Sequence, residues 1–416
     1  MNVVVLNTGT ELLLGHVLNT HLTYIAREIF PLGLRVDRQL TVSDGPAIGE
    51  ALAAVSAQAD IVFVTGGLGP TTDDITREAA AGLLKLPLRQ NPEIAAAITH
   101  RLRTRGFPMT DRILRQAQVP EGAIVLTNAY GTAPGLYLEA RAGATPHLFL
   151  LPGPPRELQP MFQASVLPIL RRIAPQGEGV KSRTFRLACV GESVVEAAVG
   201  PQLLALPGVE LGYCARLGEV DVRAIGPEST LDAADEIIRS AFPLLLFTTD
   251  DEELEAAVVR MLRARNATVA VAESCTGGYL AHRLTNVPGA SAVFLAGFVT
   301  YANEAKISAL GVEEGVIATA GAVSEEVARA MAIGTLRKTG AAFALATTGI
   351  AGPEGGTEAK PVGTVFIALA AASGRAAVLH RRFQAERPAF KHLTTQTALQ
   401  MLREHLLAEG EPAPTA

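Results

Sequence analysis

The sequence has 416 residues, of which 48% are hydrophobic and 19% charged, and its formal net charge is −5. This length exceeds one ordinary hydrophobic core, so two or three domains are expected, and the composition excludes a disordered chain. The acidic balance disfavours proteins that coat nucleic acid or an anionic membrane. We therefore predict neither nucleic acid nor membrane as a partner.

The cysteines and the apolar segments predict a cytoplasmic protein. Cys189, Cys214 and Cys275 are scattered and lack metal-ligand spacing, as expected in a reducing compartment. The first residues lack the basic segment of a signal peptide. The apolar stretch of residues 362–379 is interrupted by two glycines, a serine and Arg375, which excludes a membrane-spanning helix.

Strands and helices alternate from the first residues onward. Hydrophobic periodicity predicts strands over residues 3–6, 34–41 and 60–65 and helices over residues 19–30 and 46–58. Such alternation is typical of an α/β domain with a parallel sheet and helices on both faces. Ligands bind such sheets at the carboxyl ends of the strands, where the turns at residues 7–11, 42–44 and 65–74 fall.

The third of these turns has the composition of a phosphate-binding loop. Gly66, Gly67 and Gly69 free its backbone to wrap a phosphate, and Asp73 and Asp74 then begin a helix. Two carboxylates beside a phosphate would repel it unless a divalent cation lies between them. The pattern therefore predicts Mg²⁺ or another divalent cation, with a plain helix N-cap role for one aspartate as the alternative.

These turns, together with Gly131-Thr-Ala-Pro-Gly135 and Leu151-Pro-Gly-Pro154, resemble the molybdopterin-binding fold as used in the N-terminal domain of the CinA (competence/damage-inducible) family. The resemblance covers about residues 1–170 and implies metal-dependent hydrolysis of ADP-ribose to AMP and ribose 5-phosphate. We predict that Glu11, Asp44 and Asp74 bind the metal at the pyrophosphate and that Asp73 orients water. Molybdopterin enzymes share these turns, so adenylation or binding of molybdopterin is the alternative.

The middle of the chain predicts a small α+β domain over residues 171–250. Residues 171–180 have the Pro/Gly composition of a linker. Strands are expected over residues 183–190, 209–215 and 220–226, and helices over residues 193–206 and 230–242; the family resemblance suggests a KH-like fold. Residues 181–250 hold six Lys or Arg against ten Asp or Glu and lack the GXXG clamp of KH domains. A structural or interface role is therefore favoured over RNA binding.

The third domain, expected over residues 251–410, contains a strand-to-helix turn with a candidate nucleophile. A helix over residues 251–265 and a strand over residues 267–272 precede Glu273-Ser-Cys-Thr-Gly-Gly278, after which a second helix begins. Ser274 thus lies at the mouth of a turn. Unpaired N–H groups near Thr276, Gly277 and Gly278 favour an anionic or oxyanion-bearing ligand. The alternative is that Ser274 only caps the helix.

Two later segments supply partners for this hydroxyl. Lys306 ends the segment Phe298-Val-Thr-Tyr-Ala-Asn-Glu-Ala-Lys306 and is one of only six lysines. A lysine with a lowered pKa can deprotonate Ser274, and Tyr301 can relay the proton. Thr348 and Gly349 lead an apolar strand into a second glycine-rich loop, which offers further donors. A helix from residue 324, a hairpin over residues 362–383 and a helix over residues 391–407 complete an α/β domain.

Five ordered motifs resemble the nicotinamide-mononucleotide amidase domain of the CinA family: Glu273–Gly278, Phe298–Lys306, Gly321-Ala-Val-Ser324, Gly349-Ile-Ala-Gly-Pro353 and Lys360-Pro-Val-Gly-Thr364. The resemblance implies hydrolysis of nicotinamide mononucleotide to nicotinate mononucleotide and ammonia without a metal, and a homodimer. It carries the family's functional positions onto Ser274, Tyr301, Lys306, Thr348 and Arg387. Arg387 follows Ala385-Glu386, where the family usually has Gly-Asp.

We predict Ser274 as the nucleophile, Lys306 as the base and later the acid, Tyr301 as its relay and Arg387 as a phosphate partner. Direct attack by water is the alternative mechanism. A nucleophilic Cys275 is disfavoured because no histidine accompanies it. The sequence therefore predicts a two-activity hydrolase of the pyridine-nucleotide cycle, with an interaction protein for competence as another alternative.

Overall fold

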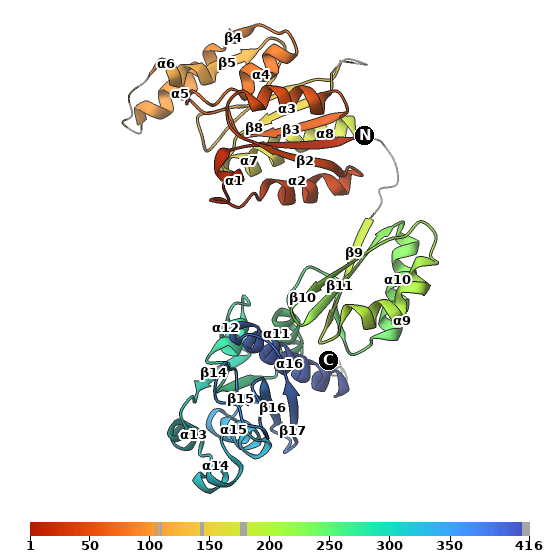
Figure 1. The fold of residues 1–416 in the computed structure, drawn as a ribbon, viewed down its shortest axis with the longest axis vertical. Coiled ribbons are helices and arrows are strands. Elements are labelled where there is room, and N and C mark those ends of the chain that lie inside the picture. The colour runs from red at the N-terminus through yellow and green to blue at the C-terminus, as the bar shows by residue number, and fades with distance from the viewer. Residues whose placement is uncertain (105, 107, 109, 142–144, 175–180, 410–416) are drawn as a thin grey trace. The chain divides into compact units, whose positions relative to one another are not determined.

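The computed structural model describes residues 1–104, 106, 108, 110–141, 145–174 and 181–409. The chain forms two compact units, Met1–Val180 and Lys181–Ala416 (Figure 1). Most of the predicted linker, residues 175–180, lies outside the described residues, whereas residues 171–173 end the last helix of the first unit. In the described part of the chain, no helix is both long enough and apolar enough to cross a bilayer.

The first unit is built around a six-stranded sheet with the order β2-β1-β3-β8-β7-β6. Its strands are β1 (Val3–Thr8), β2 (Val36–Val42), β3 (Ile61–Thr65), β6 (Ile124–Leu126), β7 (Gly135–Leu138) and β8 (His147–Leu151). The first four strands of the order run parallel, as predicted. The strands β7 and β6 add an antiparallel edge. A separate antiparallel pair consists of β4 (Leu88–Gln90) and β5 (Gln118–Pro120).

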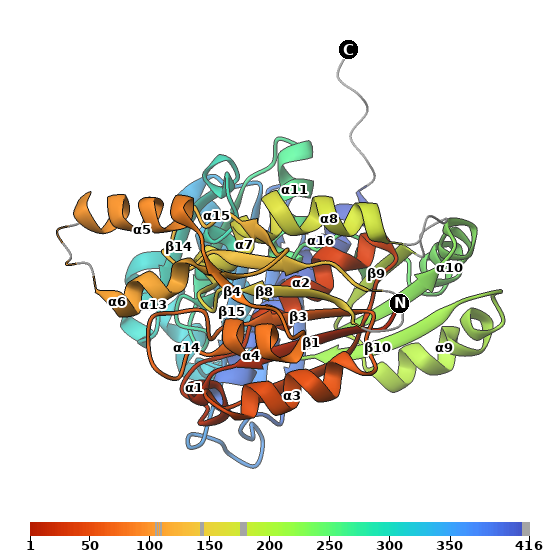
Figure 2. The ribbon, with the colours of Figure 1, turned by 90° about the horizontal axis from the view of Figure 1, so that it is seen from above.

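Helices cover both faces of this sheet. Along a buried strand, successive side chains point to opposite faces, and each face has its own hydrophobic core. Val3 and Val5 of β1 face one core, and Val4 and Leu6 face the other. Figure 2 shows α3 and α4 on one side of the strands and α7 and α8 on the other. The helices are α1 (Thr10–Leu13), α2 (His21–Ile29), α3 (Ala47–Ser56), α4 (Thr76–Leu83), α5 (Pro92–Thr104), α6 (Asp111–Leu114), α7 (Pro155–Met161) and α8 (Leu167–Ile173).

The second unit contains two sheets. The first is antiparallel with the order β10-β11-β9-β12, and its strands are β9 (Lys181–Ala188), β10 (Glu210–Arg216), β11 (Glu219–Gly226) and β12 (Leu246–Thr248). Helices α9 (Glu192–Leu204) and α10 (Glu228–Ala241) pack against it around one hydrophobic core. The sequence predicted all of these elements except β12, which is too short to show a periodicity.

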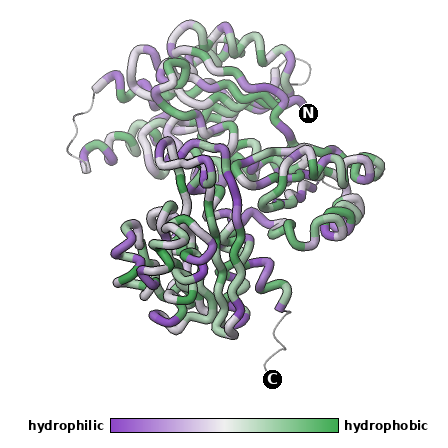
Figure 3. The backbone as a smooth tube through the Cα atoms, turned by 60° about the horizontal axis from the view of Figure 1, so that its bottom comes forward, coloured by the Kyte–Doolittle hydropathy of each residue, from purple (hydrophilic) through white to green (hydrophobic). Residues whose placement is uncertain are grey.

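The second sheet has the order β14-β13-β15-β16-β17. Its strands are β13 (Val269–Glu273), β14 (Phe294–Val299), β15 (Phe343–Gly349), β16 (Thr364–Ala371) and β17 (Ala376–Arg382). Strand β13 runs parallel to β14 and β15, and β16 and β17 form the predicted hairpin. Figure 3 shows hydrophobic segments inside each unit and hydrophilic segments mainly outside.

Two layers of helices enclose this sheet. One layer packs around a core with α11 (Leu254–Ala264), α12 (Tyr279–Thr285) and α16 (Arg387–Ala408). The other layer contains α13 (Asn303–Leu310), α14 (Glu314–Ala320) and α15 (Glu325–Thr339). The register pairs Glu273 with Val299 on one side and with Thr347 on the other. The residues that follow these three positions therefore emerge together at the carboxyl edge of the parallel strands.

Candidate functional sites

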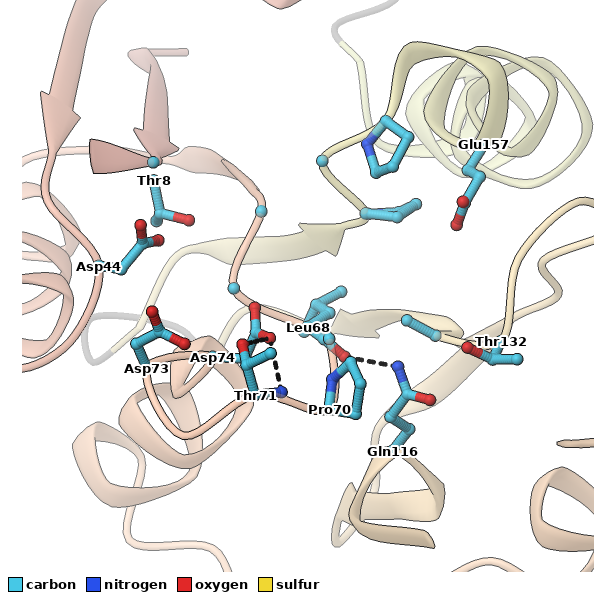
Figure 4. Close-up of a pocket in the computed structure, with 18 of the residues that line it drawn as sticks. Thr8, Asp44, Leu68, Pro70, Thr71, Asp73, Asp74, Gln116, Thr132 and Glu157 are labelled. Carbon is cyan, nitrogen blue, oxygen red and sulfur yellow. Dashed lines mark hydrogen bonds between the residues drawn. The ribbon is translucent and has the colours of Figure 1, made fainter. Parts of the chain in front are cut away.

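A pocket of about 380 Å³ lies at the carboxyl ends of the parallel strands of the first unit (Figure 4). The three turns predicted to bind ligands all contribute to it. The sequence-predicted residues that line it are Glu11, Asp44, Gly66, Gly67, Gly69, Asp73 and Asp74. Five of its lining residues are acidic, and none of the described lining residues is Lys, Arg or His. An anionic ligand would therefore need a cation that the lining side chains do not supply.

The aspartates of this pocket are held by neighbouring threonines. Asp44 Oδ2 accepts hydrogen bonds from the backbone N–H of Thr10 at 2.9 Å and from its hydroxyl at 3.2 Å. Asp74 Oδ2 accepts from the backbone N–H of Thr71 at 3.0 Å and also from the Thr71 hydroxyl. Helix α4 begins at Thr76, so the prediction that Asp73 and Asp74 begin a helix, or that one of them caps it, is wrong.

The arrangement of these carboxylates does not form a preassembled metal cage. Within the described ranges, no group of three or more His, Cys, Asp or Glu side chains is placed to hold a metal ion. The expectation that Glu11, Asp44 and Asp74 together gather one ion is therefore not met by the protein alone. The donors are all oxygens, which Mg²⁺ prefers, and Mg²⁺ commonly binds through one or two carboxylates together with substrate phosphates. The residues fit a cation shared with a phosphate ligand.

Sequence reasoning missed two residues of this pocket. Glu157 lies three residues beyond the Leu151–Pro154 motif and accepts a hydrogen bond from Asn128 Nδ2 at 2.8 Å. Gln116 is 1% exposed, donates to the carbonyl of Leu68 at 3.3 Å and leaves Oε1 without a partner. Glu157 could have been found from its place at the start of the helix after that motif. No local pattern marks Gln116, because only the tertiary fold brings it to the glycine-rich loop.

The second candidate site is the Ser274 turn, which follows β13. The backbone N–H of Ser274 donates to the carbonyl of Thr347 at 2.9 Å, and the carbonyl of Ser274 accepts from Gly277 at 3.2 Å. Ser274 is partly exposed, as a nucleophile requires. Gly277 and Gly278 have φ values of 59° and 91°, a left-handed conformation that glycine adopts without strain.

The backbone N–H groups at the start of α12 are hydrogen-bonded to a carboxylate of the protein itself. Glu273 is fully buried, and its carboxylate accepts hydrogen bonds from the backbone N–H groups of Gly278 and Leu280 at 3.0 Å and of Ala281 at 2.8 Å. The helix N-terminus therefore already has its anion. The sequence predicted that the N–H group of Gly278 would serve a ligand, and Glu273 shows why it cannot. Sequence reasoning assigned no role to Glu273.

The amine of Lys306 lies within hydrogen-bond distance of the Ser274 hydroxyl. Its Nζ donates to Ser274 Oγ at 3.2 Å, to the carbonyl of Thr300 at 2.9 Å and to the carbonyl of Tyr301 at 3.2 Å. The side chain is 1% exposed, and burial lowers the pKa of the Lys306 ammonium from its ordinary value. The proximity of the two groups, which the sequence predicted from residues 32 positions apart, is present in the structure.

Tyr301 and Arg387 form a contact of their own. Arg387 donates from Nη2 to Tyr301 Oη at 2.8 Å and from Nη1 to the carbonyl of Gly352 at 2.8 Å. The side chain of Tyr301 is 60% exposed. Among the described residues, no hydrogen bond joins its hydroxyl to Lys306 or Ser274. The structure thus does not assemble the predicted proton relay, and Tyr301 instead meets Lys306 through its backbone carbonyl.

The other predicted residues of this site contribute mainly to its framework. The hydroxyl of Thr348 donates to the carbonyl of Ala322 at 2.7 Å, and that of Thr276 lies 2.7 Å from the hydroxyl of Thr347. A Cβ on Gly349 would lie 2.7 Å from the carbonyl oxygen of Thr364, so this glycine permits close pairing with β16. These contacts hold the Ser274 turn and the loop after β15 in place. The hydroxyls of Thr276 and Thr348 therefore already have partners within the protein.

Cys275 is a packed residue. Its side chain is 5% exposed, and burial raises the pKa of its thiol to about 12. A thiol with this pKa is almost entirely protonated near neutral pH and is therefore a poor nucleophile. Ser274 has an amine within hydrogen-bond distance, whereas the environment of Cys275 opposes ionisation. The comparison favours the hydroxyl over the thiol.

Comparisons with known proteins match both parts of the chain. The family model described as CinA C-terminal domain matches residues 251–406, and that described as probable molybdopterin binding domain matches residues 4–172. A CinA-like protein of Akkermansia muciniphila is 44% identical over 399 residues, which cover 96% of each chain. The chain belongs to the CinA family. The Ser274 turn thus lies in the CinA C-terminal domain, and the acidic pocket lies in the molybdopterin-binding-like domain.

Other CinA proteins are also similar over most or part of the chain. A competence-damage inducible protein of Moorella thermoacetica is 43% identical over 412 residues, covering 97% of this chain and 98% of its own. The crystal structure of competence/damage inducible protein CihA from Agrobacterium tumefaciens matches with 44% identity and a TM-score of 0.36, covering 38% of this chain and 96% of that chain.

Proposed function

We propose that the C-terminal domain is an amidase that hydrolyses nicotinamide mononucleotide to nicotinate mononucleotide and ammonia. The observation that carries this proposal is the buried amine of Lys306 at 3.2 Å from Ser274 Oγ. Burial favours the neutral amine, which has a lone pair to accept the Ser274 proton. The resemblance of the motifs around these residues to the CinA amidase domain supplies the substrate.

The proposed reaction has two stages. Lys306 accepts the Ser274 proton as Oγ attacks the carboxamide carbon, and the resulting ammonium returns a proton to the nitrogen of the departing ammonia. Water then attacks the ester on Ser274, with the neutral Lys306 accepting its proton and returning one to Oγ. Each stage needs stabilisation of a negative oxygen.

The backbone N–H groups of Cys275 and Thr276 are the proposed donors to that oxygen. Among the described residues, neither group is hydrogen-bonded to a carbonyl, hydroxyl or carboxylate oxygen, whereas the N–H groups of Gly277 and Gly278 are bonded to Ser274 and Glu273. The free pair directly follows the nucleophile, so it lies close to any carbonyl attacked by Ser274 Oγ. Donors fixed by the fold need no reorganisation during the reaction.

Trapping an acyl-enzyme would test this mechanism. Rapid quenching with nicotinamide mononucleotide should leave a nicotinoyl nucleotide on the peptide that contains Ser274, and Ser274→Ala should abolish both the adduct and ammonia release. Turnover without an adduct at any quench time would favour direct attack by water. Loss of turnover in Cys275→Ala with full activity in Ser274→Ala would overturn the assignment of the nucleophile.

The N-terminal domain supports a second candidate function, hydrolysis of ADP-ribose to AMP and ribose 5-phosphate. The supporting observation is a pocket that joins a glycine-rich loop to five acidic residues, with no Lys, Arg or His among its described lining residues. We propose that Asp44 or Asp74 and Glu11 hold Mg²⁺ or another divalent cation together with the pyrophosphate, and that Asp73 orients water. When bound, the cation would neutralise phosphate charge and act as a Lewis acid.

One experiment separates the two activities and the alternatives. The full chain is incubated with nicotinamide mononucleotide and with ADP-ribose, each with and without EDTA. Ammonia release should survive chelation, and AMP formation should not. Turnover of ATP with molybdopterin, but not of ADP-ribose, would favour cofactor biosynthesis, and inactivity towards all substrates would favour an interaction protein for competence. We further propose a cytoplasmic homodimer that acts on free nucleotides and has neither nucleic acid nor membrane as a partner.

A further inference from the structure

We propose that Lys391, together with Arg387 one helical turn earlier, binds the phosphate of the nucleotide substrate beside the Ser274 turn. This inference rests on the proposed amidase function and names the group that distinguishes a nucleotide from a nucleoside or a free base. It also moves the phosphate away from the glycine-rich helix start, where the sequence predicted an anion.

The helix start is not available to a phosphate. The carboxylate of Glu273 accepts from the N–H groups of Gly278, Leu280 and Ala281, so the first turn of α12 already holds a buried negative charge. A phosphate at the same place would lie against this carboxylate, and like charges repel. The N–H group of Gly277 is bonded to the carbonyl of Ser274. Because the N–H groups of Cys275 and Thr276 are the proposed oxyanion donors, the phosphate needs side-chain cations beside this turn.

Lys391 is placed to supply the charge. A Cβ on Gly277 would lie 3.7 Å from Lys391 Nζ, and Gly277 itself is exposed. The hydrogen bond from Gly277 to Ser274 closes a four-residue turn, whose ends lie within about 7 Å of each other. Lys391 Nζ also lies 6.0 Å from the centre of the Tyr279 ring, on the first turn of α12. The ammonium is thus next to the nucleophile turn.

Lys391 has no competing negative partner in the part of the chain that the structure describes. No carboxylate of the described residues lies within 4.0 Å of its ammonium. The other lysines of this domain near the glycine-rich loops are already in use: Lys306 is buried beneath Ser274, and Lys360 donates to the carbonyl of Ala320 at 2.8 Å. Among the described residues, Lys391 therefore has the Tyr279 ring beside it and no carboxylate partner, so its charge is available to an anion at the rim of the site.

Arg387 completes a pair of cations on one helix. Residues four positions apart on an α-helix lie on the same face, so Arg387 and Lys391 project from α16 side by side. Arg387 uses one donor for the Gly352 carbonyl and one for the Tyr301 hydroxyl, and a guanidinium has five. Two adjacent cations match the double charge of a phosphate monoester, and each contact to it would be charge-assisted.

Substrate discrimination tests the proposal. Lys391→Met should lower kcat/KM for nicotinamide mononucleotide by about 10- to 100-fold, mainly through KM, because a hydrogen bond between charged groups is lost. The ratio of kcat/KM for the nucleotide to that for nicotinamide riboside should fall by the same factor. Lys338→Met, in the last turn of α15, removes an equal charge outside the site and should leave this ratio unchanged. Equal losses for the nucleotide and the riboside would overturn the proposal.

A binding measurement keeps this test independent of the amidase assignment. Titration of inorganic phosphate and of nicotinate mononucleotide into the full chain, followed by calorimetry, should give weaker binding for Lys391→Met than for Lys338→Met, with a reduced dependence on salt. If the wild-type chain released no ammonia but Lys391→Met still weakened phosphate binding, the amidase proposal would fail and the phosphate site would stand. Unchanged phosphate binding in Lys391→Met would show that Lys391 does not bind the phosphate, and the proposed site would be wrong.

Discussion

Lys306 Nζ donates to the carbonyl of Thr300 at 2.9 Å, and among the described residues no carboxylate lies within 4.0 Å of this amine. A buried ammonium surrounded by carbonyl and hydroxyl oxygens, with no described carboxylate at ion-pair distance, loses its hydration and gains only partial compensation. Its pKa therefore falls below the ordinary value for lysine. Burial of this amine lowers the stability of the folded protein. The same burial favours the neutral amine, which can act as a base.

The pH dependence of the amidase follows from this shift. The reaction needs the neutral amine, so kcat/KM is expected to rise with pH and to level off above the pKa of Lys306, which lies below 10.5. Lys306→Met should lower kcat/KM by about 10²- to 10⁴-fold and abolish the pH-dependent rise. A pH profile of both proteins checks this. An unchanged profile in the variant would show that another group titrates.

The stability of Lys306→Met provides a second measurement. Because the folded-state pKa of Lys306 is lower than its unfolded-state value, the unfolded chain binds more protons between these two pKa values, and stability increases with pH across that range. Lys306→Met removes the cost of burying a charged amine, and the methionine side chain has a volume similar to that of lysine. Its thermal midpoint at pH 7 should equal or exceed that of the wild type. A large decrease would mean that the amine contributes more to the fold than its hydrogen bonds indicate.

Cys275 and Ser274 should respond oppositely to substitution. Cys275→Ala is expected to keep ammonia release within a few-fold of wild type and to cost about 1 kcal/mol of stability from lost packing. Ser274→Ala should lose turnover and keep its stability. With its pKa raised to about 12, native Cys275 should also resist iodoacetamide at pH 8. Rapid alkylation of this thiol in the folded protein would contradict the burial that we describe.

Glu273 should act as a positioning residue for the nucleophile turn. Glu273→Ala leaves three N–H groups, one buried and two partly buried, without their acceptor and is expected to destabilise the domain by about 2 kcal/mol. Glu273→Gln keeps one acceptor oxygen and should recover part of both stability and kcat. Denaturant unfolding and steady-state kinetics measure the two effects. Equal stability of all three proteins would show that water can replace the carboxylate.

The buried arginine of α12 should contribute far more to stability than a surface arginine. Arg283 is 4% exposed and donates to Glu255 at 2.6 Å and to Gln396 at 2.7 Å. Arg283→Met leaves Glu255 without its cation and should cost about 3–5 kcal/mol. Arg260→Met removes an exposed pair with Glu252 and should cost no more than about 1 kcal/mol. Comparable losses from both substitutions in denaturant unfolding would contradict this ranking.

The sequence determined the elements that bear the site. Local patterns suffice for β13 and for the Ser274 turn, because a buried strand and two left-handed glycines leave their marks within a few residues. The family motifs also sufficed to name Lys306 and Ser274 together. The parallel part of the first sheet followed from strand–helix alternation, whereas its antiparallel edge, built from short strands β6 and β7, did not.

Only the tertiary structure decided which polar groups are free. Glu273 directly precedes Ser274 in sequence, yet the return of its carboxylate to three N–H groups of α12 depends on how the turn folds over β13. Tyr301 reaches Arg387, and Lys391 reaches Gly277, across about 90 to 115 residues of chain. The physical reason is that sequence periodicity reports burial along one element. The partner of a polar side chain is set by the packing of elements that are distant in sequence.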